Sequence, residues 1–312
     1  MKPKHPIKPY LLLLIGILAV STAAIFIRLV LREASALVVA AYRLAISALI
    51  SGFLLLISKK GQRAHVERKD ISLLILSGVF LAAHFAAWIT SLEHISVSSS
   101  VILVTTTPLW VALLSPIVLK EKVSSRFYWG MLVAIIGGIS IAMSGPCRFS
   151  AAGFSCSGSI FDSGNQTLLG MALALFGAWM ASGYMLIGRK MRLKMDNLSY
   201  TTSVYTVSAI VLILAVILRG EKVLGYSPQV YALFVALAVI PQLLGHSVLN
   251  YSLEALPATV VSMALLGEPV GSTILAVIFL NEIPSTLEII GGIFILFGIV
   301  ISVLPERNPN VV

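Results

Sequence analysis

The sequence predicts an all-α integral membrane protein with ten transmembrane helices that form two inverted five-helix repeats. Three observations lead to this fold class. Hydrophobic residues make up 58% of the 312 residues and charged residues only 11%, with a mean hydropathy of +0.99. The hydrophobic residues occur in ten long runs, and part of the first half of the chain recurs in the second. A soluble fold could not cover so much apolar surface, and the same composition excludes disordered, collagenous and disulfide-rich secreted proteins.

The ten apolar runs have the length of transmembrane helices. About 20 residues at about 1.5 Å each cross the roughly 30 Å of hydrocarbon in a bilayer. Long unbroken runs favour helices over a β-barrel, whose strands alternate over about 10 residues. The first run follows three lysines, as a signal peptide would, but further apolar runs come after it rather than a soluble domain. The predicted spans are 10–27, 34–57, 71–90, 97–119, 127–144, 168–188, 198–218, 230–253, 258–280 and 286–304.

The basic residues predict how these spans are oriented. With a cytoplasmic N-terminus, the cytoplasmic segments hold 16 of the 22 Lys and Arg residues, the external segments hold five, and one lies within a span. This asymmetry follows the positive-inside rule, so we expect a multi-pass protein of the cell membrane with both termini in the cytoplasm. The pI of about 9.7 then reflects topology. Because the basic residues form no binding module, no nucleic-acid partner is expected.

The connection 145–167 is the longest between two spans, and we expect it outside the cell. It contains both cysteines, Cys147 and Cys156. They could form a disulfide in an oxidising compartment or remain free thiols. The connection divides the chain into a first repeat, 1–144, and a second repeat, 168–312.

An internal repeat supports this division. An offset of 161 residues superposes ten identical residues without a gap over about 47 positions, relating the third to fifth spans to the eighth to tenth. Five crossings are an odd number, so the second copy must enter the bilayer upside down. The charges agree, because Lys120-Glu121-Lys122 on the inside becomes Asn281-Glu282-Ile283 on the outside. The superposed pairs are Ser91/Ser252, Leu92/Leu253, Glu93/Glu254, Pro108/Pro269, Leu114/Leu275, Leu119/Leu280, Glu121/Glu282, Ser124/Ser285, Gly130/Gly291 and Gly137/Gly298.

The second copy resembles a known repeat. Gly267-Glu268-Pro269-Val270, followed by Asn281-Glu282 and Gly291-Gly292, is similar to the EamA-type repeat of the drug/metabolite transporter superfamily. The first copy, from Thr107-Pro108 through Glu121 to Gly137-Gly138, is a weaker match. The resemblance covers nearly the whole chain. It implies a ten-helix carrier of small metabolites, commonly an exporter, from a family whose substrates include amino acids.

Two charged residues lie well inside predicted spans, Arg43 and Glu268. A charge there costs about 2.5–3.5 kcal/mol on insertion scales, so each should face a cavity or a partner. We predict that Glu268 exchanges a proton during transport and that Arg43 contacts the solute. The alternatives are structural: Glu268 could pair with Arg43 or with free backbone amides, and Arg43 could form a helix-packing salt bridge.

Two stripes of side chains spaced four residues apart could line a central cavity. Such spacing places residues on one helical face. A hydrogen-bonding stripe opposite an aromatic one would suit an amphipathic solute. Each histidine could instead be a packing residue, and the spacing is not that of metal ligands. The stripes are Gln242, His246 and Asn250 on one span and Phe80, His84 and Trp88 on another.

Three further side chains, Thr106, Trp179 and Tyr205, could complete the lining. Pro108 and Pro269 occupy matching places in the repeats and lack a backbone donor, so both should interrupt their helices. Paired interruptions of this kind point to the binding site of a carrier. The sequence contains no phosphate-binding loop, catalytic triad or cysteine-rich metal site, so no cofactor is expected.

Together these patterns predict a secondary-active transporter, not an enzyme, that exports small metabolites such as amino acids or amphipathic compounds. Its partners would be a small solute and membrane lipids; its oligomeric state is not predicted. An uncoupled facilitator or exchanger is the nearest alternative. A polytopic membrane enzyme, with His84, His246 and Glu268 acting on a lipid-like substrate, belongs to a different class.

Overall fold

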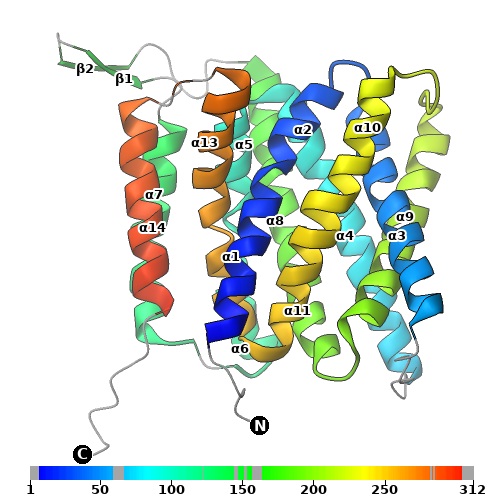
Figure 1. Ribbon diagram of the computed structural model, residues 1–312. Coiled ribbons are helices and arrows are strands. Elements are labelled where there is room, and N and C mark those ends of the chain that lie inside the picture. Colours follow the sequence, from blue (N-terminus) through cyan, green and yellow to red (C-terminus); the bar gives the residue numbers. More distant parts are fainter. Residues whose placement is uncertain are drawn as a thin grey trace, which may run out of the picture.

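The computed structural model describes residues 7–58, 67–121, 123–143, 147–150, 153–156, 164–281, 283 and 285–303. Over these residues the regular secondary structure consists of helices and one two-stranded hairpin. Figure 1 shows the helices side by side between two ends of the molecule. The first helix begins and the last helix ends at one end, here called the termini end, and the hairpin lies at the opposite hairpin end (Figure 1).

Six helices run without interruption. Polar side chains start two of them, because Ser35 and Asp196 accept hydrogen bonds from the backbone amides of Val38 and Ser199. The uninterrupted helices are α3 (Ala36–Ile57), α4 (Arg68–His94), α7 (Ser125–Ala142), α8 (Gly164–Arg192), α9 (Asn197–Arg219) and α14 (Thr286–Val303).

Four predicted spans are interrupted helices. Prolines explain three of them, because a proline lacks the amide that a continuous helix requires. Pro108 follows the break between α5 and α6, Pro269 follows the break between α12 and α13, and Pro241 lies in a π-helical turn. The segments are α1 (Ile7–Ser21) with α2 (Ala23–Val30), α5 (Val97–Val104) with α6 (Thr107–Val118), α10 (Pro228–Leu237) with η1 (Ala238–His246) and α11 (Ser247–Ala255), and α12 (Ala258–Ala264) with α13 (Gly267–Leu280).

The helices have the dimensions and surface of a membrane protein. Among the described residues, eight helical stretches are long and apolar enough to cross a bilayer. Only 33–56% of each stretch is buried inside the molecule, and large side chains such as Leu56 and Leu218 lie 86% exposed. Such a surface needs lipid around it. The predicted fifth and tenth spans, α7 and α14, are not among the eight.

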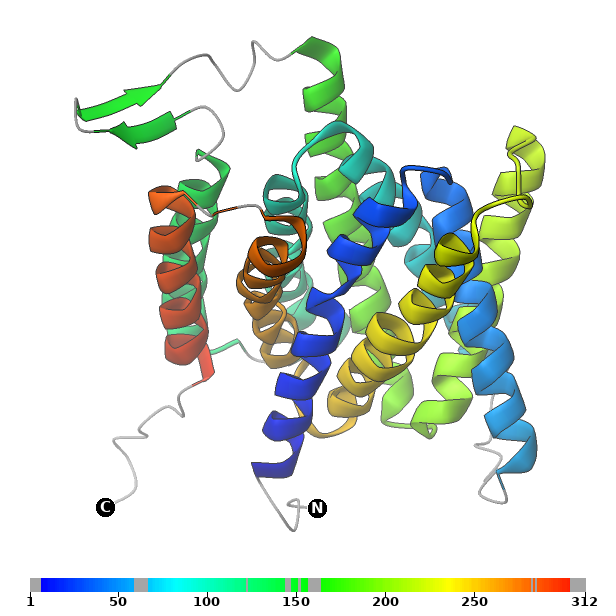
Figure 2. The ribbon, with the colours of Figure 1, turned by 45° about the horizontal axis from the view of Figure 1, so that its top comes forward.

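Helices α7 and α14 form a pair beside the main bundle. Figure 2 shows them next to each other and set apart from the other helices. Glycines allow their close approach: a Cβ atom added at Gly137 would lie 2.5 Å from the carbonyl oxygen of Gly291, and one at Gly298 would lie 2.5 Å from that of Gly130. Gly137 of α7 thus faces Gly291 of α14, and Gly130 faces Gly298. Because residue numbers fall along one helix as they rise along the other, the two helices are antiparallel.

The hairpin is a departure from the all-helical prediction. Strands β1 (Cys147–Ser150) and β2 (Gly153–Cys156) are antiparallel, with Cys147 opposite Cys156 in the register. Whether the two cysteines form a disulfide or remain free thiols depends on their side chains, which lie outside the part of the chain that the structure describes. A strand is predicted from a sustained alternation of apolar and polar residues. The connection has no such pattern over most of its length, so the hairpin was not predicted.

Candidate functional site

A cavity lies in the middle of the bundle. Its lining combines residues from both predicted repeats. All four interrupted spans contribute close to their interruptions: Val20 and Ala23, Thr105 and Thr107, His246, and Leu265 and Glu268. Irregular backbone is tolerated inside a membrane where it lines a cavity. Of the predicted site residues, the cavity brings together Arg43, His84, Trp88, His246, Asn250 and Glu268.

Arg43 projects from α3 and is completely buried. Its Nε donates a hydrogen bond of 2.8 Å to Oε1 of Gln242, and its guanidinium carbon lies 4.1 Å from the centre of the Phe85 ring. The terminal nitrogens Nη1 and Nη2 have no hydrogen-bond partner among the described residues. The guanidinium is thus held along one edge and over one face, while the fork of its two terminal nitrogens is unpaired.

Glu268 lies in the first turn of α13, 8% exposed. Among the described residues, its carboxylate forms no ion pair, although it lines the same cavity as Arg43. The helix-packing salt bridge considered for Arg43 is therefore absent from the described part of the chain. Thr107 occupies the place that matches Glu268 in the first repeat and also lines the cavity.

The two histidines have different surroundings. His84 Nδ1 donates to the carbonyl oxygen of Gly177 over 2.9 Å, since a carbonyl can only accept, and the imidazole stacks on Trp88. His246 lies edge-on to Phe85, with ring centres 5.3 Å apart. His84 therefore contributes to helix packing as well as to the cavity lining.

Gln242 accepts the Arg43 hydrogen bond, and neither Gln242 nor Tyr205 is part of the cavity lining. The Tyr205 hydroxyl contacts Ser247 Oγ at 3.2 Å and the Gln242 carbonyl oxygen at 3.4 Å. These contacts fix the π-helical turn that carries Gln242, so both residues position the guanidinium.

Two further predicted lining residues, Thr106 and Trp179, also lie outside the cavity lining. Thr106 borders a second, apolar cavity together with Pro108, between α5, α6, α7 and α14. Trp179 is 51% exposed on the outer surface of α8, with its ring near Trp110. After the turn between α5 and α6, Thr107 rather than Thr106 lines the cavity. On α8, Tyr184 lines it rather than Trp179.

The 161-residue offset also relates contacts beside the cavity, which sequence reasoning missed. Ser182 Oγ donates to the carbonyl oxygens of Ala178 and Thr107, at 2.8 and 3.2 Å. Ser21 Oγ contacts those of Ile17 and Glu268, at 2.8 and 3.5 Å. The residues correspond in pairs that are 161 positions apart: Ser21 with Ser182, Ile17 with Ala178, and Thr107 with Glu268. An ungapped comparison of the first and sixth spans pairs Gly16 with Gly177 as well as Ser21 with Ser182, and so contained the signal.

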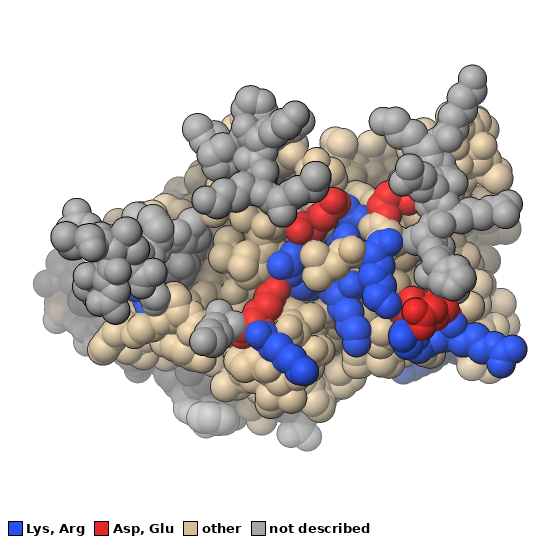
Figure 3. Space-filling model, turned by 90° about the horizontal axis from the view of Figure 1, so that it is seen from below, with Lys and Arg blue, Asp and Glu red and all other residues tan. Residues whose placement is uncertain are grey.

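An arginine near each end of the bundle donates a hydrogen bond to a backbone carbonyl oxygen on another helix. Arg28 donates to the Leu92 carbonyl oxygen at the hairpin end, and Arg189 donates to that of Leu253, at 2.6 Å, at the termini end. We refer to them as the hairpin-end contact and the termini-end contact. Charged side chains of both signs gather on the face of the molecule at the termini end (Figure 3).

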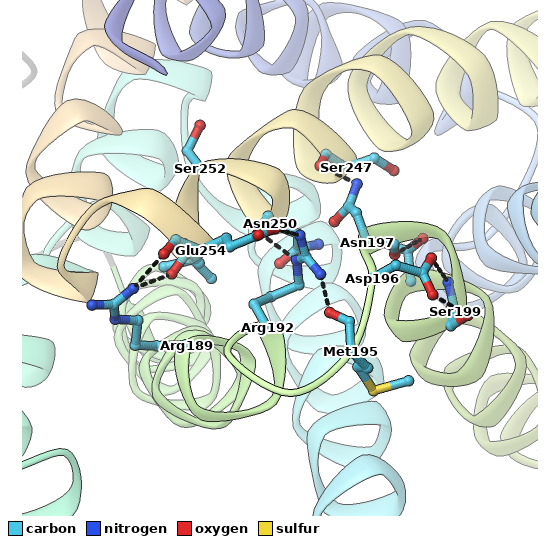
Figure 4. A network of polar contacts seen from close by, with 12 residues as sticks. Arg189, Arg192, Met195, Asp196, Asn197, Ser199, Ser247, Asn250, Ser252 and Glu254 are labelled. Atoms are coloured by element: carbon cyan, nitrogen blue, oxygen red, sulfur yellow. Dashed lines mark hydrogen bonds and ion pairs between the residues drawn. The ribbon is translucent and has the colours of Figure 1, made fainter. Parts of the chain in front are cut away.

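A polar network surrounds the termini-end contact (Figure 4). Arg189 also binds Glu121 and the Glu254 carbonyl oxygen, at 2.7 and 3.1 Å. Arg192 pairs with the Glu254 carboxylate and donates to the Asn250 carbonyl oxygen. These arginines bind backbone carbonyl oxygens at the C-terminus of α11, where a positive charge is favourable.

Comparisons with known proteins agree with this architecture. The EamA-like transporter family matches residues 7–143 and, separately, residues 168–304. An uncharacterized transporter of Archaeoglobus fulgidus is 25% identical over 303 residues, which cover 96% of this chain and 99% of the relative. The pseudopaline exporter CntI of Pseudomonas aeruginosa is 24% identical over 282 residues, covering 90% and 92%. A solved structure with 17% identity superposes with a TM-score of 0.73, covering 95% of this chain and 96% of the other, and shows the same fold.

Proposed function

The chain belongs to the EamA-like transporter family, and from that premise we propose that it is a secondary-active exporter of small metabolites, driven by proton exchange at Glu268. The relatives named as transporters and as an exporter support a membrane transporter rather than an enzyme. The name of the pseudopaline exporter supports the outward direction. The substrate classes proposed are amino acids and amphipathic compounds.

The proposed architecture is ten spans in two inverted repeats, 1–144 and 168–312, joined by the external connection 145–167. The antiparallel pair of α7 and α14 supports the inclusion of both as the fifth and tenth spans. Contacts that recur at an offset of 161 support two related halves. Basic residues gathered at the termini end (Figure 3) support its placement in the cytoplasm of the cell membrane.

One observation carries the proposal: the cavity lies between the halves, at the interruptions of four spans, and holds Glu268. Secondary transporters with inverted repeats bind solute at such a place and alternate between two openings. A carboxyl group in an apolar cavity exchanges its proton when its access to water or its charged neighbours change. Glu268 can therefore carry a proton inwards as solute leaves.

Proteoliposomes test this function. Purified protein is reconstituted with a mixed pool of amino acids and amphipathic compounds, and uptake is followed with and without an imposed pH gradient. We expect accumulation that depends on the gradient, and in Glu268→Gln only equilibrating exchange. Glu67→Gln is the matched control, because Glu67 pairs with Lys69 on the exposed surface. Unchanged gradient dependence in Glu268→Gln would refute the coupling role.

A further inference from the structure

We infer that the cavity recognises the carboxylate group of its solute through the free fork of Arg43. This rests on the proposed function and narrows its substrate class to small carboxylates with an apolar body. The observation behind it is the guanidinium itself, fully buried at the cavity with Nη1 and Nη2 unpaired among the described residues.

A buried guanidinium without partners is costly. Arginine offers five N–H donors in a fixed plane, and only the one on Nε is occupied, by Gln242. Leaving a buried charge uncompensated costs several kcal/mol, so such a group is normally paired. Glu268, the only carboxylate in the described lining, is not within ion-pair distance. The missing partner is therefore an anion that enters the cavity.

The surroundings hold the fork in place. Gln242 fixes the Nε edge, and the Phe85 ring supports the guanidinium face from 4.1 Å. Tyr205 in turn bonds to the carbonyl of Gln242. An arginine restrained in this way needs little reorganisation to bind a planar anion through two parallel hydrogen bonds.

The charge of the cavity favours a carboxylate over a phosphate. Arg43 is the only lysine or arginine in the described lining, and Glu268 adds a negative charge whenever it is ionised. A monoanion matches one guanidinium, whereas a phosphate dianion would need further cations. Trp88, Met185, Leu249 and Leu265 give the remaining lining an apolar character that suits the body of the solute.

Ligand-induced thermal stabilisation of the purified protein tests this inference without transport. The probes are four carboxylates, namely L-phenylalanine, L-leucine, 3-phenylpropionate and 4-methylpentanoate, their four amides, and inorganic phosphate. We expect at least one carboxylate to stabilise the wild type, and its amide to bind at least about tenfold more weakly. Arg43→Gln should abolish this preference, and Arg43→Lys, which keeps the charge without the fork, should reduce it. Arg219→Gln, on the exposed surface, is the control.

The outcomes separate the inference from the proposed function. Equal binding of carboxylate and amide, binding of no carboxylate, stronger binding of phosphate, or an unchanged preference in folded Arg43→Lys would each overturn the inference. Coupling through Glu268 could still hold in each case. Conversely, carboxylate preference through Arg43 together with normal coupling in Glu268→Gln would overturn the proposed coupling alone.

Discussion

The two ends of the molecule share one contact, made once in each half of the chain. Arg28 binds the carbonyl oxygen of Leu92 at the hairpin end, and Arg189 binds that of Leu253 at the termini end. Arg28 lies 161 residues before Arg189, and Leu92 lies 161 residues before Leu253. Their surroundings differ: the termini end adds ion pairs of Arg189 with Glu121, of Arg192 with Glu254 and of Lys194 with Asp70.

The sequence explains the difference in part. The positions that match Arg192 and Lys194 are Leu31 and Glu33, so the hairpin end cannot form two of those ion pairs. Glu33 instead accepts hydrogen bonds from the backbone amide and hydroxyl of Ser227. Glu282, which matches Glu121, lies outside the described residues. The two ends thus share one contact and differ in the polar contacts around it, and we expect the termini end to open less readily.

The largest expected effect comes from removing the termini-end arginine. Arg189→Ala loses two carbonyl contacts and the ion pair with Glu121, which should favour opening of that end by about 2–3 kcal/mol. Arg28→Ala loses one contact and should favour opening of the hairpin end by about 1 kcal/mol. The measurement is labelling of a cysteine at Ala181, in the cavity, by an impermeant maleimide applied from either side.

The labelling needs a background in which Cys147 and Cys156 are serine. Lys190→Ala is the control for the termini end, because Lys190 is exposed next to Arg189. Equal and opposite shifts in Arg28→Ala and Arg189→Ala would contradict the expected difference between the two ends.

Sequence reasoning located the cavity through the cost of burying charge and the four-residue spacing of polar side chains. Those signals concern a single helix, and they placed Arg43, Glu268 and both histidines where the structure has them at the cavity. Periodicity does not continue across a helix break, so it could not show whether Thr106 or Thr107 faces the cavity. Burial cost also could not show that Arg43 is unpaired, because that depends on side chains from other helices.

The repeat was recognised only from the third to the fifth span. In the first and sixth spans, the matching residues are isolated within apolar sequence that matches almost anything. Ser21 with Ser182 and Arg28 with Arg189 become meaningful only through carbonyl oxygens on distant helices. Every residue has a backbone carbonyl oxygen. The type of the residue that accepts such a hydrogen bond therefore gives no sign of the contact in the sequence.

A second comparison concerns the glycines between α7 and α14, where the two halves should respond alike. Gly137→Ala and Gly298→Ala each place a methyl group 2.5 Å from a facing carbonyl oxygen. Because both clashes involve backbone, each should lower the free energy of unfolding by about 2 kcal/mol. Thermal unfolding in detergent measures this. Gly292→Ala, whose methyl group would have its nearest neighbour 3.8 Å away, is the control. Clearly different losses at the two sites would show that the contacts are not equivalent.

The serines beside the cavity should respond unequally. Ser182→Ala removes a 3.2 Å hydrogen bond to Thr107 on another helix and should cost about 1 kcal/mol of unfolding free energy. Between helices, Ser21→Ala removes a weaker contact, of 3.5 Å with Glu268, and should therefore cost less. Ser203→Ala, which loses a bond within its own helix, provides the baseline in the same unfolding measurement. A larger loss in Ser21→Ala than in Ser182→Ala would reverse the expected ranking.

The smallest effect concerns pH at the hairpin end. The backbone amide of Ser227, and then its hydroxyl, lower the pKa of the exposed Glu33 carboxyl, against a minor opposing effect of burial. A lowered folded-state pKa means that this contact stabilises the fold above the pKa of an unfolded glutamate, about 4.3, and is lost as the pH falls through the folded value. Hydrogen exchange of the Ser227 amide, relative to its intrinsic rate, should therefore lose protection in acid. In Glu33→Gln this protection should no longer vary over that pH range, because an amide does not titrate. Acid loss of protection that persists in Glu33→Gln would place the titrating group elsewhere and remove the chemical distinction between the two ends.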